Sequence, residues 1–513
     1  SMEEEVVFEN GTRGMVLRLD ENYVYAVLLG NESGVKRGAQ VMGTGEALSV
    51  PVGDELLGRV VNPLGDAVDG GPPFQNTQKY PIERPAPSIF DRRPIKEQLE
   101  TGVMMIDAIL PLGRGQRESI IGDPKSGKSN SVYTAIINQA RQGVYSVLVT
   151  IGKPQSKTKA FVEKLRKEGL LDKVTIVMGT SSMSPTLNFI APYAGTSIAE
   201  FFMENGKNVL IVYDDLSQHA KYYRQMSLLL KRSPGREAYP GDAFFIHSRL
   251  LERAAAMKKE LGGGSLTALP IIEIKERDLT GYISTNVLSI TDGHILYDIG
   301  LFNKNIIPSI ALELSVSRLG GKVQCDALKN LGVKTSQQLM QYREAEAFAH
   351  FGTDLADETK KRISRGTIIN EMLKQDPYQS IKLEYQIIIL FGLTKGFLDK
   401  VDLKKAKEMR AKLLEYLDSG KDSELINKLT QEKLAILTNP LNDFFASIAS
   451  EIINPYEIVG KKDADLDDTN TEAEDNEPEK EEKSKNKKRN KKKKAKKEAK
   501  NETKQANKTD PEK

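Results

Sequence analysis

The octapeptide GDPKSGKS at residues 122–129 constrains this chain more than any other segment. It fits the pattern Gly, four residues, Gly-Lys-Ser, in which a glycine-rich loop surrounds phosphate groups. The preceding ESIIG is typical of a short buried strand, and the following NSVYTAIINQA is typical of an amphipathic helix. Strand, loop and helix in this order predict a phosphate-binding P-loop inside a parallel α/β sheet.

Each residue type in the loop has a chemical reason to be there. Glycines at 122 and 127 let the backbone turn so that successive amides point toward phosphate oxygens. Lys128 is expected to contact the β- and γ-phosphates, and Ser129 offers a hydroxyl to Mg²⁺. The expected nucleotide-binding residues of the loop are Gly122, Asp123, Pro124, Lys125, Ser126, Gly127, Lys128 and Ser129.

A P-loop also needs an acidic group at the end of a neighbouring strand to hold the metal. NVLIVYDDL supplies Asp214 as the candidate Mg²⁺ partner, and Asp215 as a cap for the helix that follows. Hydrolysis further requires a group that activates water, often a carboxylate just past the strand after the P-loop helix. That place reads VTIGKPQSK, with Lys153 and Gln155 and no carboxylate before Glu163. The sequence therefore supports nucleotide binding without a catalytic base.

Four segments of different character divide the chain. Residues 1–48 alternate apolar and polar positions between turn signals, which predicts short antiparallel strands. Residues 49–325 alternate strand and helix patterns, which predicts a central α/β nucleotide-binding domain. Residues 326–460 are helical in pattern, and we expect an all-α domain. Residues 461–513 form an acidic block and then a basic block, which cannot bury a core and is expected to be disordered.

Charge and cysteine content exclude several classes of protein. Residues 461–513 hold 18 of the 74 basic and 15 of the 71 acidic residues, leaving 56 of each sign in the body. A neutral body has no electrostatic footprint for nucleic acid. The single cysteine, Cys325, cannot form an internal disulfide and fits a reducing compartment. Without a signal peptide or a long apolar run, membrane contact is expected only through partner proteins.

Several long segments that are not general P-loop features resemble the alpha subunits of the rotary F-type ATP synthases. Between Glu5 and Glu457 they include PVGDELLGRVVNPLGDAVDG, PLGRGQRESIIGD, IVYDDLSQHAKYYRQMSLLLKRSPGREAYPGDAFFIHSRLLERAA, GGGSLTALPIIE, STNVLSITDGHI, LSVSRLGG and FGTDLADETKKRISRG. The resemblance implies a small β barrel, a RecA-like P-loop domain and a helical C-terminal domain.

The resemblance also implies partners and a location. Three alpha and three beta subunits would alternate around a central gamma shaft, with peripheral stalk subunits attached. The chain would belong to a proton-transporting two-sector ATPase, peripheral on the cytoplasmic side of the cell membrane. Contact with the membrane would come only through the ion-conducting sector, which couples proton transport to ATP synthesis or hydrolysis.

Residue roles follow from the same resemblance. Alpha subunits bind ATP or ADP with Mg²⁺ without turning it over, consistent with Lys153 where the catalytic subunit has a glutamate. The SVSR motif places Ser315 and Arg318 as the residues contributed to catalysis, with Arg318 reaching the γ-phosphate in the neighbouring beta site. Pro308 and Gln375 are the implied residues on the adenine side.

The chain departs from the family pattern in three places around the nucleotide. Lys125 stands where alpha subunits usually carry Gln, Ile307 replaces the Arg before Pro308, and Gln-Gly-Gln reads Gln-Asp-Pro at 375–377. Two polar groups of the adenine pocket are therefore missing. Compared with the family pattern, the given sequence is expected to begin inside the β barrel, after the position of the usual amino-terminal helix, and the charged tail is additional to that pattern.

Two other interpretations stay open. An alpha-like subunit could serve a specialised rotary ATPase that hydrolyses ATP for other work, such as motility. A hexameric RNA translocase, or a stand-alone or secretion ATPase, would need its own catalytic carboxylate, and the translocase also a basic and aromatic RNA surface. Lys153 and the neutral body argue against this second group.

Overall fold

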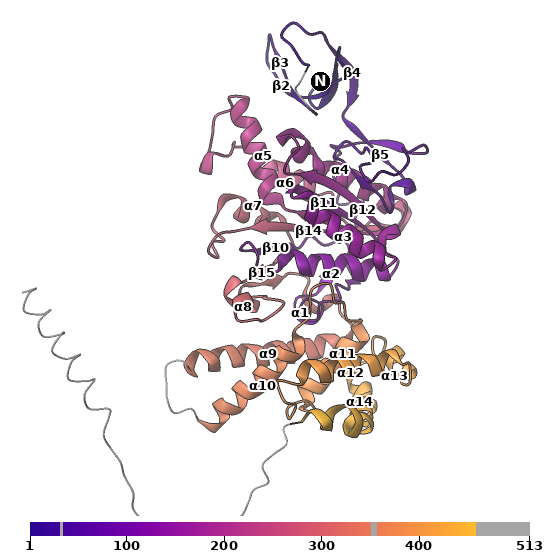
Figure 1. The fold of residues 1–513 in the computed structure, drawn as a ribbon, viewed down its shortest axis with the longest axis vertical. Helices are drawn as coiled ribbons and strands as arrows, with labels where there is room; N and C mark the ends of the chain where they lie inside the picture. The colour runs from indigo at the N-terminus through magenta and orange to yellow at the C-terminus, as the bar shows by residue number, and fades with distance from the viewer. Residues whose placement is uncertain (31–33, 350–355, 458–513) are drawn as a thin grey trace, which may run out of the picture. The chain divides into compact units, whose positions relative to one another are not determined.

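The computed structural model describes residues 1–30, 34–349 and 356–457 (Figure 1). The tail predicted to be disordered, 461–513, lies outside this range, as does part of the segment FGTDLADETKKRISRG. In the part of the chain that is described, no helix is long and apolar enough to cross a membrane.

The N-terminal segment is an antiparallel sheet, as predicted. Its four strands are ordered β3-β2-β1-β4. The turn between the first two strands contains Gly11, whose φ of 79° lies in the left-handed region that glycine adopts without steric cost. The strands are β1 (Glu4–Phe8), β2 (Arg13–Leu19), β3 (Val24–Leu28) and β4 (Val41–Ala47).

The central domain is built on an eight-stranded sheet with the order β16-β15-β10-β14-β13-β11-β12-β6. All neighbours pair in parallel except the edge strand β16, which runs antiparallel to β15. The strands are β6 (Val60–Val61), β10 (Ser119–Gly122), β11 (Tyr145–Lys153), β12 (Val174–Thr180), β13 (Asn208–Asp214), β14 (Ser265–Glu273), β15 (Gly293–Tyr297) and β16 (Val316–Ser317). Two strand pairs lie outside this sheet: β5 (Ser49–Val52) with β7 (Gln78–Pro81), and β8 (Gln98–Leu99) with β9 (Leu112–Gly113).

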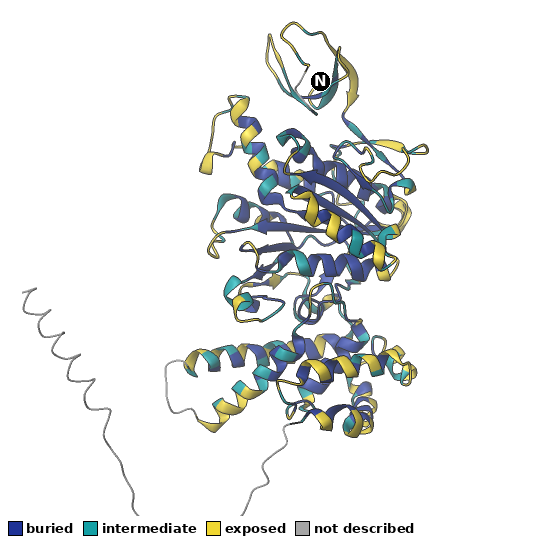
Figure 2. Ribbon diagram, viewed as in Figure 1, coloured by how far each residue is buried: buried dark blue, intermediate teal, exposed yellow. Residues whose placement is uncertain are grey.

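Both faces of this sheet are apolar because helices cover both of them. Along β11, Leu148 belongs to one hydrophobic core, while Val147 and Val149 belong to the other. The first face is covered by α2 (Lys128–Arg141) and α3 (Gln155–Lys167). The second is covered by α4 (Pro185–Glu204), α5 (Leu216–Leu229), α6 (Ala243–Leu251) and α7 (Tyr282–Ile290). Figure 2 shows the strands buried between these helices. The exposed edge at the carboxyl ends of the strands is therefore where a ligand can bind.

The C-terminal domain is helical, as predicted, and α11 forms its most buried part. Its segment SELINKLTQEKLAIL, which is helical in pattern, forms two helices rather than one. It splits into α13 and α14, and the amide of Leu434 at the new start donates to Asp326 Oδ2 at 2.9 Å. The helices are α9 (Asp326–Ala349), α10 (Asp357–Leu373), α11 (Leu383–Lys395), α12 (Ala406–Asp418), α13 (Ser423–Lys428) and α14 (Leu434–Ile448).

A buried polar junction joins the short helix α1 (Met104–Ile109) to the helical domain. The Asp107 carboxylate accepts from the amide and hydroxyl of Thr101, both at 2.7 Å, and from Gln386 Nε2 of α11 at 2.8 Å. The Gln375 side chain accepts from the amide of Met104 at 2.8 Å. Burial raises the pKa of Asp107 to about 6, although these hydrogen bonds oppose the shift.

Candidate functional site

The P-loop connects β10 to α2 directly, so its amides lie at the carboxyl edge of the sheet. Gly122 ends the strand with a φ of 154°, and a Cβ atom there would collide with the carbonyl oxygen of Tyr297. Gly127 precedes the helix with a φ of 92°, in the left-handed region. Both conformations favour glycine, which is the physical reason for the spacing seen in the sequence.

Lys128 is the first residue of α2 and folds back over its own loop. Its Nζ donates to the carbonyl oxygens of Gly122 at 2.5 Å and Asp123 at 2.6 Å. Burial lowers the pKa of the Lys128 ammonium, and the charges of Glu273 and Asp215 oppose that shift. The ammonium is thus fixed beside the loop where phosphate oxygens would lie.

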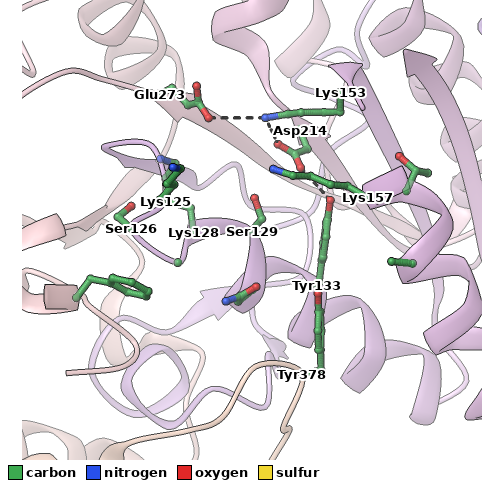
Figure 3. A pocket seen from close by; sticks show the side chains of 15 residues that line it. Lys125, Ser126, Lys128, Ser129, Tyr133, Lys153, Lys157, Asp214, Glu273 and Tyr378 are labelled. Atoms are coloured by element: carbon green, nitrogen blue, oxygen red, sulfur yellow. Dashed lines mark hydrogen bonds and ion pairs between the residues drawn. The ribbon is translucent and has the colours of Figure 1, made fainter. Parts of the chain in front are cut away.

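Four neighbouring strands end at this site, and three of them bring charged side chains together. Lys153 ends β11, Asp214 ends β13 and Glu273 ends β14. Lys153 Nζ lies 3.0 Å from Asp214 Oδ1 and 3.7 Å from Glu273 Oε1 (Figure 3). It also lies 2.8 Å from Asp215 Oδ2. Burial lowers the pKa of Lys153, but the negative charges of Asp214 and Asp215 raise it by more. The pKa of Lys153 therefore lies above its ordinary value. The position that was expected to lack a base holds a protonated amine.

Asp215 also caps the next helix, as predicted. Its Oδ1 accepts from the amide of Gln218 at 2.7 Å in the first turn of α5. This contact satisfies one of the free amides at a helix start. The two adjacent aspartates therefore have different surroundings, since Asp214 faces the pocket while Asp215 is fully buried behind it.

An aromatic stack bounds the pocket on the side of the helical domain. The ring of Tyr133 in α2 stacks on Phe161 of α3 at 4.4 Å between centroids, and Tyr378 lies 6.5 Å from Tyr133. Tyr133 also donates its hydroxyl to Asp214 Oδ2 at 2.9 Å (Figure 3). Both carboxylate oxygens of Asp214 are therefore engaged, one by Lys153 and one by Tyr133.

The residues proposed for the metal fit Mg²⁺ in donor type. Ser129 lines the pocket and offers a hydroxyl, and Asp214 offers a carboxylate. Oxygen donors of this kind, completed by nucleotide phosphates and water, are how proteins usually hold Mg²⁺. Within the described ranges, no group of three or more His, Cys, Asp or Glu side chains could hold a metal ion on its own. A metal here would therefore depend on the nucleotide.

The two residues implied on the adenine side line a smaller cavity next to the P-loop. Pro308, which follows a cis peptide bond, and Gln375 border this cavity together with Gly127 and Phe302. The amide group of Gln375 is already committed, because its Nε2 donates to Gly102 O at 2.8 Å in addition to the contact with the amide of Met104. Gln375 therefore forms part of the wall and has little capacity left for a base.

Ser315 and Arg318 lie apart from the P-loop, at the β16 edge of the sheet. The Ser315 hydroxyl is buried, donates to Ala311 O at 2.7 Å and accepts from the amide of Leu296 at 3.0 Å. These two hydrogen bonds hold the segment before β16 in place, and the expected contribution of Ser315 to catalysis stays a prediction. Arg318 is exposed, and it is not among the described residues that line either cavity.

Glu273, Tyr133 and Lys157 line the pocket and were not expected from the sequence. Glu273 ends a buried apolar strand, PIIE, in the same way that Asp214 does, so that signal was present in the sequence. Tyr133 lies one helical turn past Ser129 and Lys157 lies in the first turn of α3, and neither pattern distinguishes them from ordinary helix residues. Together, the sheet, the loop and the pocket define a P-loop nucleotide-binding protein.

Three family models match successive parts of the chain. The beta-barrel domain of the ATP synthase alpha/beta family matches residues 1–45, its nucleotide-binding domain matches 102–317, and the C terminal domain of the alpha/beta chain matches 324–450. Similar curated proteins include ATP synthase subunit alpha of Clostridium botulinum (strain Eklund 17B / Type B), 49% identical, with 83% of this chain and 84% of that one covered. ATP synthase subunit alpha of Aquifex aeolicus is 44% identical, with 83% of this chain and 85% of that one covered. The same subunit of a Sulfurovum species is 46% identical, with 87% of this chain and 90% of that one covered. The chain belongs to the ATP synthase alpha/beta family, and within it to the alpha subunits of the F-type ATP synthase.

Proposed function

We propose that the P-loop of this chain holds ATP or ADP without hydrolysing it. The observation that supports this proposal is the protonated side chain of Lys153 in the pocket. A protonated amine with a raised pKa, ion-paired to Asp214 and Asp215, cannot take a proton from water. The one other carboxylate that lines the pocket, Glu273, faces the same lysine at 3.7 Å.

The bound nucleotide would lie along the loop with its phosphates against the backbone amides. Lys128 would contact the β- and γ-phosphates, and Ser129 and Asp214 would hold Mg²⁺, which would neutralise part of the phosphate charge. The base would lie toward Pro308 and Gln375, which form a wall with few free polar groups. The chain would therefore bind mainly through the phosphates.

The catalytic contribution of the chain would be made in a neighbouring subunit. Arg318 is exposed at the sheet edge and away from its own pocket, which suits a residue that reaches across an interface. A guanidinium placed beside a γ-phosphate stabilises the charge of the transferring group. We propose a ring in which three of these chains alternate with three beta subunits around a gamma shaft, with a peripheral stalk, and no nucleic acid. The ring would lie peripherally on the cytoplasmic side of the cell membrane.

The domain limits given above, 1–48, 49–325, 326–460 and 461–513, form part of the same proposal. Purification of the native complex tests the partners, because a beta-type chain with shaft and stalk subunits is expected. A complex that turns over ATP without a beta-type chain would contradict the ring.

The direct test of nucleotide holding uses the full-length chain alone. It should bind Mg-ATP in a calorimetric titration and show no steady ATPase activity. Lys128→Ala should abolish binding, because it removes the ammonium fixed beside the loop. Robust ATP turnover by the pure chain would contradict the proposal.

A further inference from the structure

The position of Lys153 bears on how the site handles metal. Its ammonium lies among three carboxylates, two of them within 3.0 Å, from Asp214, Asp215 and Glu273. Lys153 is only partly exposed, so solvent screens these contacts weakly. A fixed positive charge therefore lies beside the carboxylate proposed to hold Mg²⁺.

The lining of the pocket is positive as a whole. Four lysines line it, and two carboxylates, Asp214 and Glu273, face them. The lysines are Lys125, Lys128, Lys153 and Lys157. Even when the buried Asp215 is added, positive side chains outnumber negative ones. In P-loop sites generally, one lysine and Mg²⁺ share the neutralisation of the phosphates.

Asp214 is also less available to a metal than a free carboxylate would be. Its Oδ1 is paired with Lys153 and its Oδ2 accepts from Tyr133. A metal that used Asp214 would have to displace or share these partners. The gain in binding energy from adding Mg²⁺ is correspondingly reduced.

We propose that Lys153 is a built-in counter-ion, so that this P-loop retains a nucleoside triphosphate with little dependence on Mg²⁺. The inference rests on the proposed nucleotide binding and adds a property to it. Lys153 offsets the three carboxylates that would otherwise repel the phosphates. Together with Lys125, Lys128 and Lys157 it supplies charge that Mg²⁺ ordinarily brings.

The experiment measures ATP binding to the full-length chain by calorimetry, once with millimolar Mg²⁺ and once with EDTA. For the unaltered chain the two dissociation constants should agree within about threefold, which is less than 1 kcal/mol. In Lys153→Gln, binding in EDTA should weaken about tenfold or more relative to binding in Mg²⁺. The matched control is Lys157→Gln, which removes a lysine from the same pocket that, within the described ranges, forms no ion pair with Asp214, Asp215 or Glu273. It should weaken binding in both conditions alike.

Each possible outcome supports or overturns the counter-ion role. A preference of the unaltered chain for Mg²⁺ of about tenfold or more would overturn that role and leave nucleotide binding intact. The role is also overturned if Lys153→Gln and Lys157→Gln respond identically to EDTA. Absence of ATP binding in both conditions would overturn the proposed function itself. A melting curve shows whether Lys153→Gln folds. If it does not fold, the ratio of the two ATP dissociation constants of the unaltered chain, in EDTA and in Mg²⁺, still tests the counter-ion role.

Discussion

The buried ion pair between Arg253 and Glu200 gives the sharpest stability prediction. Arg253 is 1% exposed and Glu200 is 3% exposed, and two hydrogen bonds of 2.7 Å join the guanidinium to the carboxylate. The same guanidinium donates to Ile82 O at 2.7 Å and to Ser197 Oγ at 2.9 Å. Arg253, which follows α6, is thereby hydrogen-bonded both to α4 and to the residue that follows β7.

Arg253→Met keeps most of the side-chain volume and removes all four bonds. Glu200 would then remain buried with one weaker partner, Arg84 Nη1 at 3.1 Å. Breaking a buried ion pair costs about 3–5 kcal/mol, and the remaining partner places the expected loss near the lower end, at about 3 kcal/mol. That loss corresponds to a fall in melting temperature of about 6 °C or more for a domain of this size.

Calorimetry and far-UV circular dichroism suit the measurement because the chain contains no tryptophan. Arg84→Met is the matched control, since Arg84 is partly exposed and its loss should cost about 1 kcal/mol or less. Arg253→Met combined with Glu200→Leu removes the unpaired charge and should recover much of the stability. A loss below about 1 kcal/mol for Arg253→Met, or no recovery in the double variant, would refute the reasoning.

Two further predictions concern catalysis and pH. Arg318→Ala should leave ATP binding by the full-length chain intact and slow hydrolysis by complexes reconstituted with beta subunits by about 10³-fold. Arg318→Lys should restore little, because an ammonium lacks the planar fork, and near-normal rates for Arg318→Ala would refute the role in the neighbouring site. His219 and His247 are fully buried, with ring nitrogens 3.1 Å apart, and burial lowers the pKa of His247 to about 4. As pH falls from about 6.5 to about 4, the imidazole of His247 is protonated in the unfolded chain before it is protonated in the folded chain, so this group alone should lower the free energy of unfolding by about 3 kcal/mol. His247→Gln should flatten that part of the profile in denaturant titrations, and an unchanged slope would contradict the assignment.

The local parts of the site could be predicted from sequence because they depend on residues close together in the chain. The strand–loop–helix around GDPKSGKS and the capping role of Asp215 are of this kind. The meeting of Lys153, Asp214 and Glu273 is different, because it depends on the order β10-β14-β13-β11. Chain order does not give that strand order, so the ion pairs could not be predicted.

Contacts between particular side chains and backbone groups also decide details that sequence patterns leave open. Within SELINKLTQEKLAIL, α13 ends at Lys428 and α14 begins at Leu434, whose amide donates to Asp326, a residue more than a hundred positions earlier. The motif of Ser315 predicts a contribution to catalysis, which stays a prediction, and its hydrogen bonds with Ala311 and Leu296 could not be inferred from that motif. Periodicity and motifs carry no information about such partners.

The junction around Asp107 has a mechanical consequence. Swinging the helical domain away from α1 would break the hydrogen bond from Gln386 to Asp107 and would leave the buried amide of Met104 without Gln375, and an unpaired buried amide costs about 1–3 kcal/mol. Gln324, just before α9, adds a third hydrogen bond, because its Nε2 donates to the carbonyl oxygen of Asp107 at 2.7 Å. The short helix should travel with the C-terminal helices as one stiff body, although it precedes the P-loop in the chain.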